Sequence, residues 1–414
     1  MSKKFKNPFI SLKYKNFRYY WFGMNISLIG SWMQSIAQPW LALTVTNDPF
    51  LVSIVAVAQF LPTLILSLFS GVLVDKVNTK YILFISQIGL MLVAIGFSIM
   101  TILDQALYIN ILMLATANGI FSCIDAPARH SFVYELVDDD DYIQNAVALN
   151  SMAFNVARIL GPGLAGMVMM SFGVKYCFIF NAISFAAIIV SLFFIKPNRK
   201  ISKQENKGNV LLSIKDGFNY VKNQKIISHN LFITLIITMF IPHYNITISA
   251  LCKFILGGGE QTFGYLMSFL GIGSFFGAFF IAMYGKLNLR LINTIPFITS
   301  FSLFCIGIWQ NFWVVALFLS LTGFCFVITA ASINSTIQLN TKNEFRGRVM
   351  SIYSLFFQGS VPFGAIFSGY FTNKFGANIG LFVCAISAIV CLLVLMFYSK
   401  YDKNKPILKS IFFK

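Results

Sequence analysis

The stretch KPNRKISKQENKGNVLLSIKDGFNYVKNQK, at residues 196–225, divides the chain into two halves of similar design. It is the longest polar stretch in the sequence and holds eight Lys or Arg residues. On each side of it, apolar runs alternate with short polar breaks. A run of about 20 apolar residues is long enough to cross a bilayer as a helix. The sequence therefore predicts two helical membrane bundles joined by a polar linker.

The composition excludes a soluble protein. Of the 414 residues, 57% are apolar and only 11% are charged, whereas a soluble domain has about 25% charged residues. A membrane β-barrel is excluded because its strands would alternate polar and apolar residues, and the runs here are unbroken. The net charge of +17 does not indicate nucleic-acid binding, because the cations lie between apolar runs. We expect the lipid bilayer as the partner and no nucleic acid.

The apolar runs predict twelve membrane spans, six on each side of the linker. With the N-terminus in the cytoplasm, only Lys175, Lys253 and Lys374 fall on the outer side, as the positive-inside rule requires. Both termini are then cytoplasmic, in a multi-pass protein of the cell inner (cytoplasmic) membrane. The expected spans lie near 17–44, 50–70, 81–103, 106–126, 145–171, 174–195, 226–251, 262–284, 291–309, 312–335, 349–372 and 377–398.

These spans predict an all-α integral membrane fold. Residues 1–195 form an N-terminal six-helix bundle, 196–225 a cytoplasmic linker, 226–398 a C-terminal six-helix bundle and 399–414 a basic cytoplasmic tail. Two such halves around a central path are typical of transporters, with the substrate near the midplane. The sequence has no P-loop, GxSxG or HExxH pattern and no CxxC pair. We therefore expect no enzyme activity, no catalytic residue, no cofactor and no bound metal.

Polar residues within the spans predict the substrate path, because polar groups are costly in lipid and normally face a cavity or another helix. They form stripes at helical spacing in spans one, four, seven and eleven. Hydrogen bonding between helices is the alternative explanation for these stripes. The cavity candidates are Ser31, Gln34, Gln38, Asn118, Asn155, Arg158, His243, Asn245 and Gln358.

Arg158 is the sharpest single feature. If span five begins near Asn145, Arg158 lies about 20 Å into the membrane. A guanidinium at that depth needs a partner or water. Backbone carbonyls, a water-filled cavity and an anionic group on the substrate all remain open as partners, as does a purely structural role. His243 follows Pro242 in span seven, where the proline breaks the helical hydrogen bonding; it is a satisfied core residue or a proton relay.

The loop after span two carries the sequence GVLVDKVNTK at 71–80, which resembles motif A of the major facilitator superfamily. The matching residues are Gly71, Asp75, Lys76 and Lys80. A degenerate second copy, YGKLNLR at 284–290, follows span eight and keeps Gly285, Lys286 and Arg290.

The resemblance implies a conformational gate on the cytoplasmic side. In that family, the motif's acid faces the N-terminus of helix eleven and a cation at the inner end of helix four. The corresponding residues here are Asp75, Arg129 and the helix that begins near Gly347. An anion at a helix N-terminus is stabilised by the helix dipole.

Span five contains ARILGPGLAG at 157–166, which is similar to motif C of the exporters of this superfamily. The matching residues are Gly161, Pro162, Gly163 and Gly166, next to Arg158, whereas Ala157 departs mildly from the pattern. The resemblance implies an antiporter that exports its substrate.

Four segments, at 27–49, 125–137, 155–166 and 346–369, resemble the subgroup that contains macrolide-efflux-type and enterobactin-exporter-type proteins. The likeness runs from about residue 10 to residue 398. Spans one to three lack the membrane-centre carboxylate that some drug/proton antiporters of the family keep. The candidates for carrying the proton are therefore Asp125, Asp75 and His243, in that order.

The expected function is secondary active export of a small amphipathic organic molecule by alternating access, with proton antiport. The substrate is a siderophore or an antibiotic-like compound, and Arg158 favours an anionic ligand and hence a siderophore. The expected partners are this small molecule, protons and lipid, and the protein is expected to be a monomer. The alternatives are an importer of the same fold and a membrane protein that does not transport.

Overall fold

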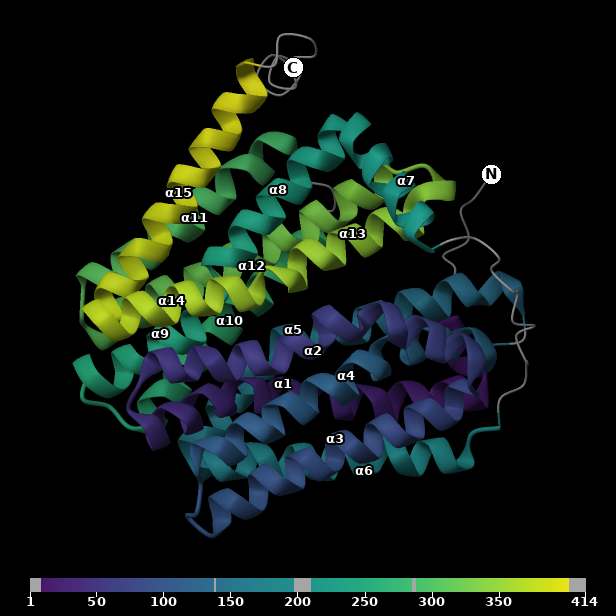
Figure 1. The fold of residues 1–414 in the computed structure, drawn as a ribbon, viewed down its shortest axis with the longest axis horizontal. Helices are drawn as coiled ribbons and strands as arrows, with labels where there is room; N and C mark the ends of the chain where they lie inside the picture. The colour runs from purple at the N-terminus through teal and green to yellow at the C-terminus, as the bar shows by residue number, and fades with distance from the viewer. Residues whose placement is uncertain (1–8, 138, 197–209, 285–287, 402–414) are drawn as a thin grey trace. The chain divides into compact units, whose positions relative to one another are not determined.

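The computed structural model describes residues 9–137, 139–196, 210–284 and 288–401, and helices dominate these four ranges (Figure 1). Contacts between residues divide the chain into two compact units. The first unit contains the chain up to Gln38 and from Leu61 to the linker. The second contains Pro39–Phe60 and the chain after the linker. The all-α membrane fold predicted from the sequence is confirmed.

Six long helices cover the described residues before the linker. In Figure 1 they run from purple through blue to teal, and α3, α4 and α6 lie side by side within the first unit. Their bounds are α1 (Lys15–Thr46), α2 (Pro49–Lys76), α3 (Thr79–Ile102), α4 (Tyr108–Leu136), α5 (Asp140–Phe172) and α6 (Val174–Phe194).

The described residues from Val210 onward form a helix at the end of the linker, α7, and then a second set of spans. A π-helical turn at Leu251–Ile255 follows the short helix α9. The bounds are α7 (Val210–Asn223), α8 (Lys225–Phe240), α9 (Tyr244–Ala250), α10 (Glu260–Tyr284), α11 (Leu289–Ile308), α12 (Phe312–Asn340), α13 (Arg346–Gly359), α14 (Val361–Phe375) and α15 (Ala377–Tyr401).

Eleven segments of the described chain are long and apolar enough to cross a membrane. They match the expected spans from the second to the twelfth. The first expected span, 17–44, forms the 32-residue helix α1 but does not reach the same hydropathy, because its stripe of Ser, Asn and Gln residues lowers the mean hydropathy. By length alone, the 32 residues of α1 would suffice to cross a membrane.

Two of the expected spans are broken near their middle. The seventh is interrupted at residues 241–243, between α8 and α9, where Pro242 cannot donate a backbone hydrogen bond. The eleventh is interrupted at Ser360, between α13 and α14. Thr238 and Ser360 share a hydrogen bond of 2.7 Å between their hydroxyls, so the two breaks are joined to each other.

The internal repeat is visible in the way that α3 and α11 begin. Asn78 caps α3 by accepting a hydrogen bond from the backbone N–H of Lys80 at 3.0 Å. Asn288 caps α11 in the same way, accepting from the N–H of Arg290 at 2.8 Å. An Asn at this position satisfies a backbone donor that the helix itself leaves unpaired. Gly285 and Lys286 of the second copy lie outside the described residues.

Close packing rather than water exclusion holds membrane helices together, because lipid is as apolar as a Leu side chain. The second unit shows this between α10 and α12. A Cβ atom added to Gly273 would collide with the carbonyl of Ser320, and one added to Gly277 would lie 2.6 Å from the carbonyl of Phe324. The glycines therefore let the two helices approach until their backbones touch.

Candidate functional site

Arg158 lies on a polar face of α5 that side chains of the protein leave partly uncovered. Its Nη2 donates to Asn155 Oδ1 at 3.0 Å, and Asn155 Nδ2 in turn donates to the carbonyl of Ser151 at 2.8 Å. Asn155 and Ser151 are exposed and Arg158 is half-buried. The three residues stand four and three positions apart, so they share one face of the helix.

The depth of this face decides what can lie against it. The membrane-crossing part of α5 is Asn145–Phe172, so Arg158 is about 20 Å from either end, near the bilayer centre. A guanidinium at that depth is costly against lipid tails and requires polar surroundings. This face of α5 is suited to water or to a polar ligand.

The same helical segment also packs on α1. A Cβ atom on Gly161 would collide with Cβ of Trp32, so the two helices approach closely at this point. Trp32 also meets Phe154 edge-on, with ring centroids 6.1 Å apart. Gly163 and Gly166 are buried, and α5 continues as a helix through Pro162. The segment similar to motif C therefore serves to seat α5 against α1.

Gln34 does not lie on the open face that the stripe of span one suggested. It is only 3% exposed and accepts a hydrogen bond from Asn181 Nδ2 of α6 at 2.7 Å. The cause is simple: Asn181 of α6 lies opposite Gln34, and two amides in contact satisfy each other. Gln34 joins α1 to α6 inside the first unit.

The other polar candidates of the first unit are also turned partly inward. Gln38 is buried, whereas Ser31 and Asn118 are half-buried. The hydroxyl of Ser31 donates to the carbonyl of Ser27 at 2.9 Å, and Asn118 Oδ1 accepts from Ser122 at 3.4 Å. Arg158 and Asn155 are the pair of candidates that the structure brings together.

In the second unit, His243 lies at the break between α8 and α9. Its imidazole is buried, and a Cβ atom on Gly364 of α14 would collide with its Nε2 atom. Beside it, Ser368 and Cys384 line a gap that is packed too tightly to admit even a water-sized sphere. This gap therefore does not hold a substrate.

The remaining candidates of the second unit, Asn245 and Gln358, carry uncharged amide side chains. Asn245 is half-buried, and its Oδ1 is buried without a hydrogen-bond partner among the described residues. Gln358 is exposed on α13, and Ser354 and Ser351 are exposed four and seven residues before it. These three residues form a second exposed polar face, which carries hydroxyl and amide groups.

Of the residues similar to motif A, Lys80 is described in full. Its Nζ donates to the carbonyl of Ile195 at 2.7 Å, directly after the last turn of α6. A cation at this place neutralises the negative end of the helix dipole. The backbone of Gly71, Asp75 and Lys76 belongs to the last turns of α2, and their side chains lie outside the described residues.

Arg129 forms an ion pair with Asp125, four residues earlier on α4. From the sequence alone, these two residues have separate expected roles, Arg129 in the gate and Asp125 in carrying the proton. Their spacing of four brings them onto one face of the helix. Asp125 is fully buried and Arg129 is 21% exposed, so the pair connects the interior of the first unit with its surface.

Two residues of α3 complete the surroundings of the carboxylate, and the sequence analysis missed both. Gln87 Nε2 donates to Asp125 Oδ1 at 2.6 Å, and Ser86 Oγ donates to the same oxygen at 3.0 Å. With Arg129 beside the other oxygen, Asp125 is held by two hydrogen bonds and one ion pair. The signal was present in the sequence, because Ser86 and Gln87 are adjacent polar residues inside an apolar run of 24 residues.

The second unit contains a further buried polar pair that sequence reasoning missed. His229 Nε2 and Asn293 Oδ1 are 2.9 Å apart, joining α8 to α11. Asn293 follows the cap of α11 by five residues, in the mixed polar and apolar stretch LRLINT. The pair holds two helices together within the second unit.

A fold of membrane-crossing helices, an arginine at mid-membrane on an open polar face and a buried, donor-bound carboxylate define a membrane transporter. The family model described as transmembrane secretion effector matches residues 6–406. The chain belongs to this family of the major facilitator superfamily. Its members are transporters, and the protein is a transporter rather than an enzyme.

Relatives of known name agree with this class. The staphyloferrin A transporter of Staphylococcus aureus is 23% identical over 395 residues, which cover 94% of this chain and 97% of the relative. Macrolide efflux protein A of Streptococcus pyogenes is 21% identical over 399 residues, covering 92% of this chain and 96% of the relative. The crystal structure of the nucleoside transporter NupG has a TM-score of 0.69, with 15% identity over 96% of this chain and all of that one.

Proposed function

We propose that the protein is a secondary active exporter that moves a small amphipathic organic anion of the siderophore class out of the cytoplasm. It works by alternating access and is driven by proton antiport. The observation that carries the proposal is Arg158, held by Asn155 on an exposed polar face of α5 at the centre of the membrane. A transported carboxylate is the partner that such a guanidinium binds well, because the two groups match as bidentate hydrogen-bonding partners.

Two observations support export rather than import. The glycines and the proline at 161–166 seat α5 against α1 next to Arg158, and their pattern is similar to the exporters' motif C. A relative that aligns with 92% of the chain is named a macrolide efflux protein. An importer of the same fold would have no reason for this motif.

The choice of substrate class rests on charge. The name of the staphyloferrin A transporter fits a siderophore, and a carboxylate-bearing chelator would satisfy Arg158. An antibiotic-like compound is the second candidate. It is favoured by the aromatic pair of Trp32 and Phe154, which lies beside the polar face of α5. Aromatic rings bind polycyclic ligands without strict hydrogen-bond matching.

We assign the transported proton to Asp125. It is fully buried and accepts hydrogen bonds from Gln87 and Ser86, so its charge depends on donors that are fixed in place. His243 is a weaker candidate, because its ring lies in a gap too small for a substrate. Asp75 belongs to the proposed gate with Gly71, Lys76, Lys80 and Arg129.

We further propose that the protein acts as a monomer in the cytoplasmic membrane, with both termini in the cytoplasm. The distribution of Lys and Arg between the predicted loops supports this orientation. The division of the chain into bundles at 1–195 and 226–398, with a linker at 196–225 and a tail at 399–414, stays a prediction about the two halves.

The direction of transport is tested by measuring accumulation in cells that express the protein. Staphyloferrin A and a macrolide serve as the two probes, each measured with and without a protonophore. Gradient-driven export predicts that the protonophore raises the intracellular level of the transported probe. A fall in the intracellular level would identify an importer and contradict the proposal.

The role of Arg158 is tested in proteoliposomes with an imposed pH gradient. We expect Arg158→Ala to lose at least about tenfold in staphyloferrin A transport, the factor that corresponds to one good charged hydrogen bond. Arg158→Lys keeps the charge and should lose less. Arg18→Ala is the matched control, because Arg18 is exposed near the start of α1. Full transport by a folded Arg158→Ala variant would remove the basis for an anionic substrate.

A further inference from the structure

The Asp125–Arg129 pair makes several contacts with one face of α1. The hydroxyl of Tyr20 donates to the carbonyl of Arg129 at 3.5 Å, and Arg129 Nη1 donates to the sulfur of Met24 at 3.4 Å. The hydroxyl of Ser27 donates to Gln87 Oε1 at 3.3 Å. Tyr20, Met24 and Ser27 are spaced by four and three residues, so they lie on a single face of the helix.

Gln87 is the residue that joins the carboxylate to this face. Its side chain is 1% exposed and both ends of its amide are used. Nε2 donates to Asp125 Oδ1 at 2.6 Å on α4, while Oε1 accepts from Ser27 on α1. A single amide on α3 therefore spans the distance between the other two helices.

The orientation of this amide depends on the charge of Asp125. An ionised carboxylate only accepts hydrogen bonds, whereas a protonated one also donates. A proton on Oδ1 would therefore face the N–H of Gln87, and two donors would point at each other. If the amide turns over, it presents Oε1 to the acid, and Ser27 then faces an NH₂ group instead of an oxygen.

We infer that Gln87 is a positioning residue that senses the charge of Asp125 and transmits it to α1 through Ser27. The inference rests on the proposed function in one respect, namely that Asp125 carries the transported proton. The α3 side chains that face Asp125, Gln87 and Ser86, are both uncharged. They respond to its charge without titrating themselves.

Several other ionisable groups lie near Asp125 and interact with its charge. Arg129 pairs with it directly, and His130 on α4 and Tyr20 on α1 interact with it electrostatically. The side chains of Asp75 and Lys76 on α2 lie outside the described residues. Arg129 supplies a fixed positive charge, so Gln87 is the neutral partner whose bonds change when the proton arrives.

The helix that receives the signal belongs to both compact units. Residues of α1 up to Gln38 belong to the first unit and those from Pro39 onward to the second. Pro39 lies inside the helix at this division, where it removes a backbone hydrogen bond and leaves a point of bending. A shift of α1 at Ser27 thus reaches the second unit along the chain itself.

The inference is tested on the purified full-length protein by two measurements that need no substrate. Infrared spectroscopy follows the C=O band of the protonated Asp125 as the pH is changed, with Asp125→Asn identifying the band. Hydrogen–deuterium exchange, corrected for the intrinsic effect of pH, follows the backbone of α1 around Ser27 over the same range. In the natural protein, we expect protonation of Asp125 and a change of several fold in the exchange of α1 to share one midpoint.

Gln87→Met removes both hydrogen bonds while keeping the length of the side chain. We expect the carboxyl band to change in frequency, because the acid loses a hydrogen-bond partner. The exchange of α1 should no longer follow the protonation of Asp125. Gln87→Asn should restore part of the response, and Gln105→Met, at an exposed position after α3, is the matched control.

Ser27→Ala keeps the inference testable if Gln87→Met folds poorly. It removes one oxygen on α1 and leaves the bond between Gln87 and Asp125 in place. We expect the carboxyl band to titrate as in the natural protein, while the exchange of α1 becomes independent of pH. A response of α1 that persists in Ser27→Ala, or in a folded Gln87→Met, would overturn the inference.

Failure of the proposed function gives a different result. If Asp125→Asn retains proton-driven transport in proteoliposomes, Asp125 does not carry the transported proton and the proposed coupling is wrong. If Asp125→Asn abolishes proton-driven transport but Gln87→Met leaves the carboxyl band and the response of α1 unchanged, the coupling stands and the role of Gln87 is refuted.

Discussion

The ammonium group of Lys253 donates a hydrogen bond to the carbonyl of Leu43 at 3.0 Å and lies 3.4 Å from the carbonyl of Thr44. Both carbonyls belong to the last turn of α1, where the carbonyl of Leu43 also accepts from the backbone N–H of Asn47 at 2.9 Å. Lys253 itself sits in the π-helical turn after α9. Within the second unit it therefore fastens the C-terminal end of α1, together with Trp40, whose ring stacks on Phe263 at 5.1 Å.

Replacing Lys253 with Met should loosen this end of α1. The variant keeps the length of the side chain but loses the charge that stabilises the helix C-terminus, at a cost of about 1 kcal/mol. We expect faster hydrogen exchange of residues 40–48 and a lower thermal midpoint. Lys374→Met is the control, because Lys374 bonds to Tyr370 on its own helix. Equal exchange in both variants would contradict the assignment.

Gly161→Ala should destabilise the packing of α5 on α1. The added methyl group would overlap Trp32 Cβ, so the helices must separate, and overpacking of this kind costs about 1–3 kcal/mol. Thermal unfolding in detergent measures the loss. Gly347→Ala is a matched control, since its new methyl group would meet no described heavy atom within 4 Å. A Gly161→Ala variant as stable as this control would refute the close approach of the two helices.

Replacing one residue of the Asp125–Arg129 pair should lower the free energy of unfolding by more than replacing both. Arg129→Met leaves a buried carboxylate with Gln87 and Ser86 as its remaining donors, and loss of one partner of a buried pair costs about 3–5 kcal/mol. The partial exposure of Arg129 reduces this to about 2 kcal/mol. The double variant Asp125→Asn, Arg129→Met should recover part of the lost thermal stability. No recovery would show that the two residues act independently.

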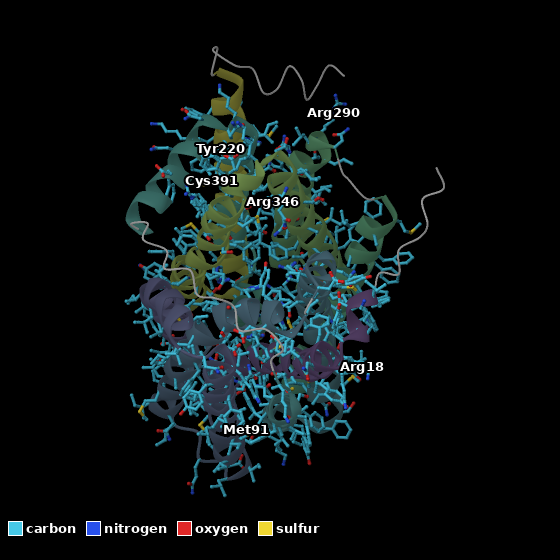
Figure 2. All side chains as sticks on the ribbon, turned by 90° about the vertical axis from the view of Figure 1, so that its right-hand side faces the viewer. Arg18, Met91, Tyr220, Arg290, Arg346 and Cys391 are labelled. Atoms are coloured by element: carbon cyan, nitrogen blue, oxygen red, sulfur yellow. The ribbon has the colours of Figure 1, made fainter. Side chains whose placement is uncertain are left out.

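The linker-end helix α7 should detach when its aromatic contact is removed. Tyr220 stacks on Phe345 with ring centroids 4.3 Å apart and accepts a hydrogen bond from the N–H of Lys342 at 3.1 Å. Figure 2 labels Tyr220 near Arg346, the first residue of α13. Tyr220→Ala removes an aromatic pair worth about 1 kcal/mol beyond its area.

Hydrogen exchange of α7 measures this detachment. We expect Tyr220→Ala to raise exchange throughout residues 216–223, where the ion pair between Asp216 and Arg348 at 3.5 Å also lies. Phe218→Ala is the control, because Phe218 is exposed on the same helix. The explanation fails if the exposed residue has the larger effect.

The fold and several local features follow directly from the sequence. Apolar runs of span length between Lys196–Lys225 and the termini determine the helices, because a backbone in lipid must satisfy its own hydrogen bonds. Pro242 marks the break after α8, and Asn78 and Asn288 mark the starts of α3 and α11. Each of these effects acts within a few residues of the chain, so the sequence itself specifies them.

The partners of the polar side chains follow from the tertiary structure instead. A stripe on α1 is equally compatible with a cavity and with another helix, and only the packing shows that Gln34 meets Asn181 while Arg158 and Asn155 stay on an open face. Gln87 acquires its importance because α3 brings it between Asp125 and Ser27. The physical reason is that periodicity specifies which residues share a face, whereas the identity of the neighbouring helix depends on contacts between residues far apart in the chain.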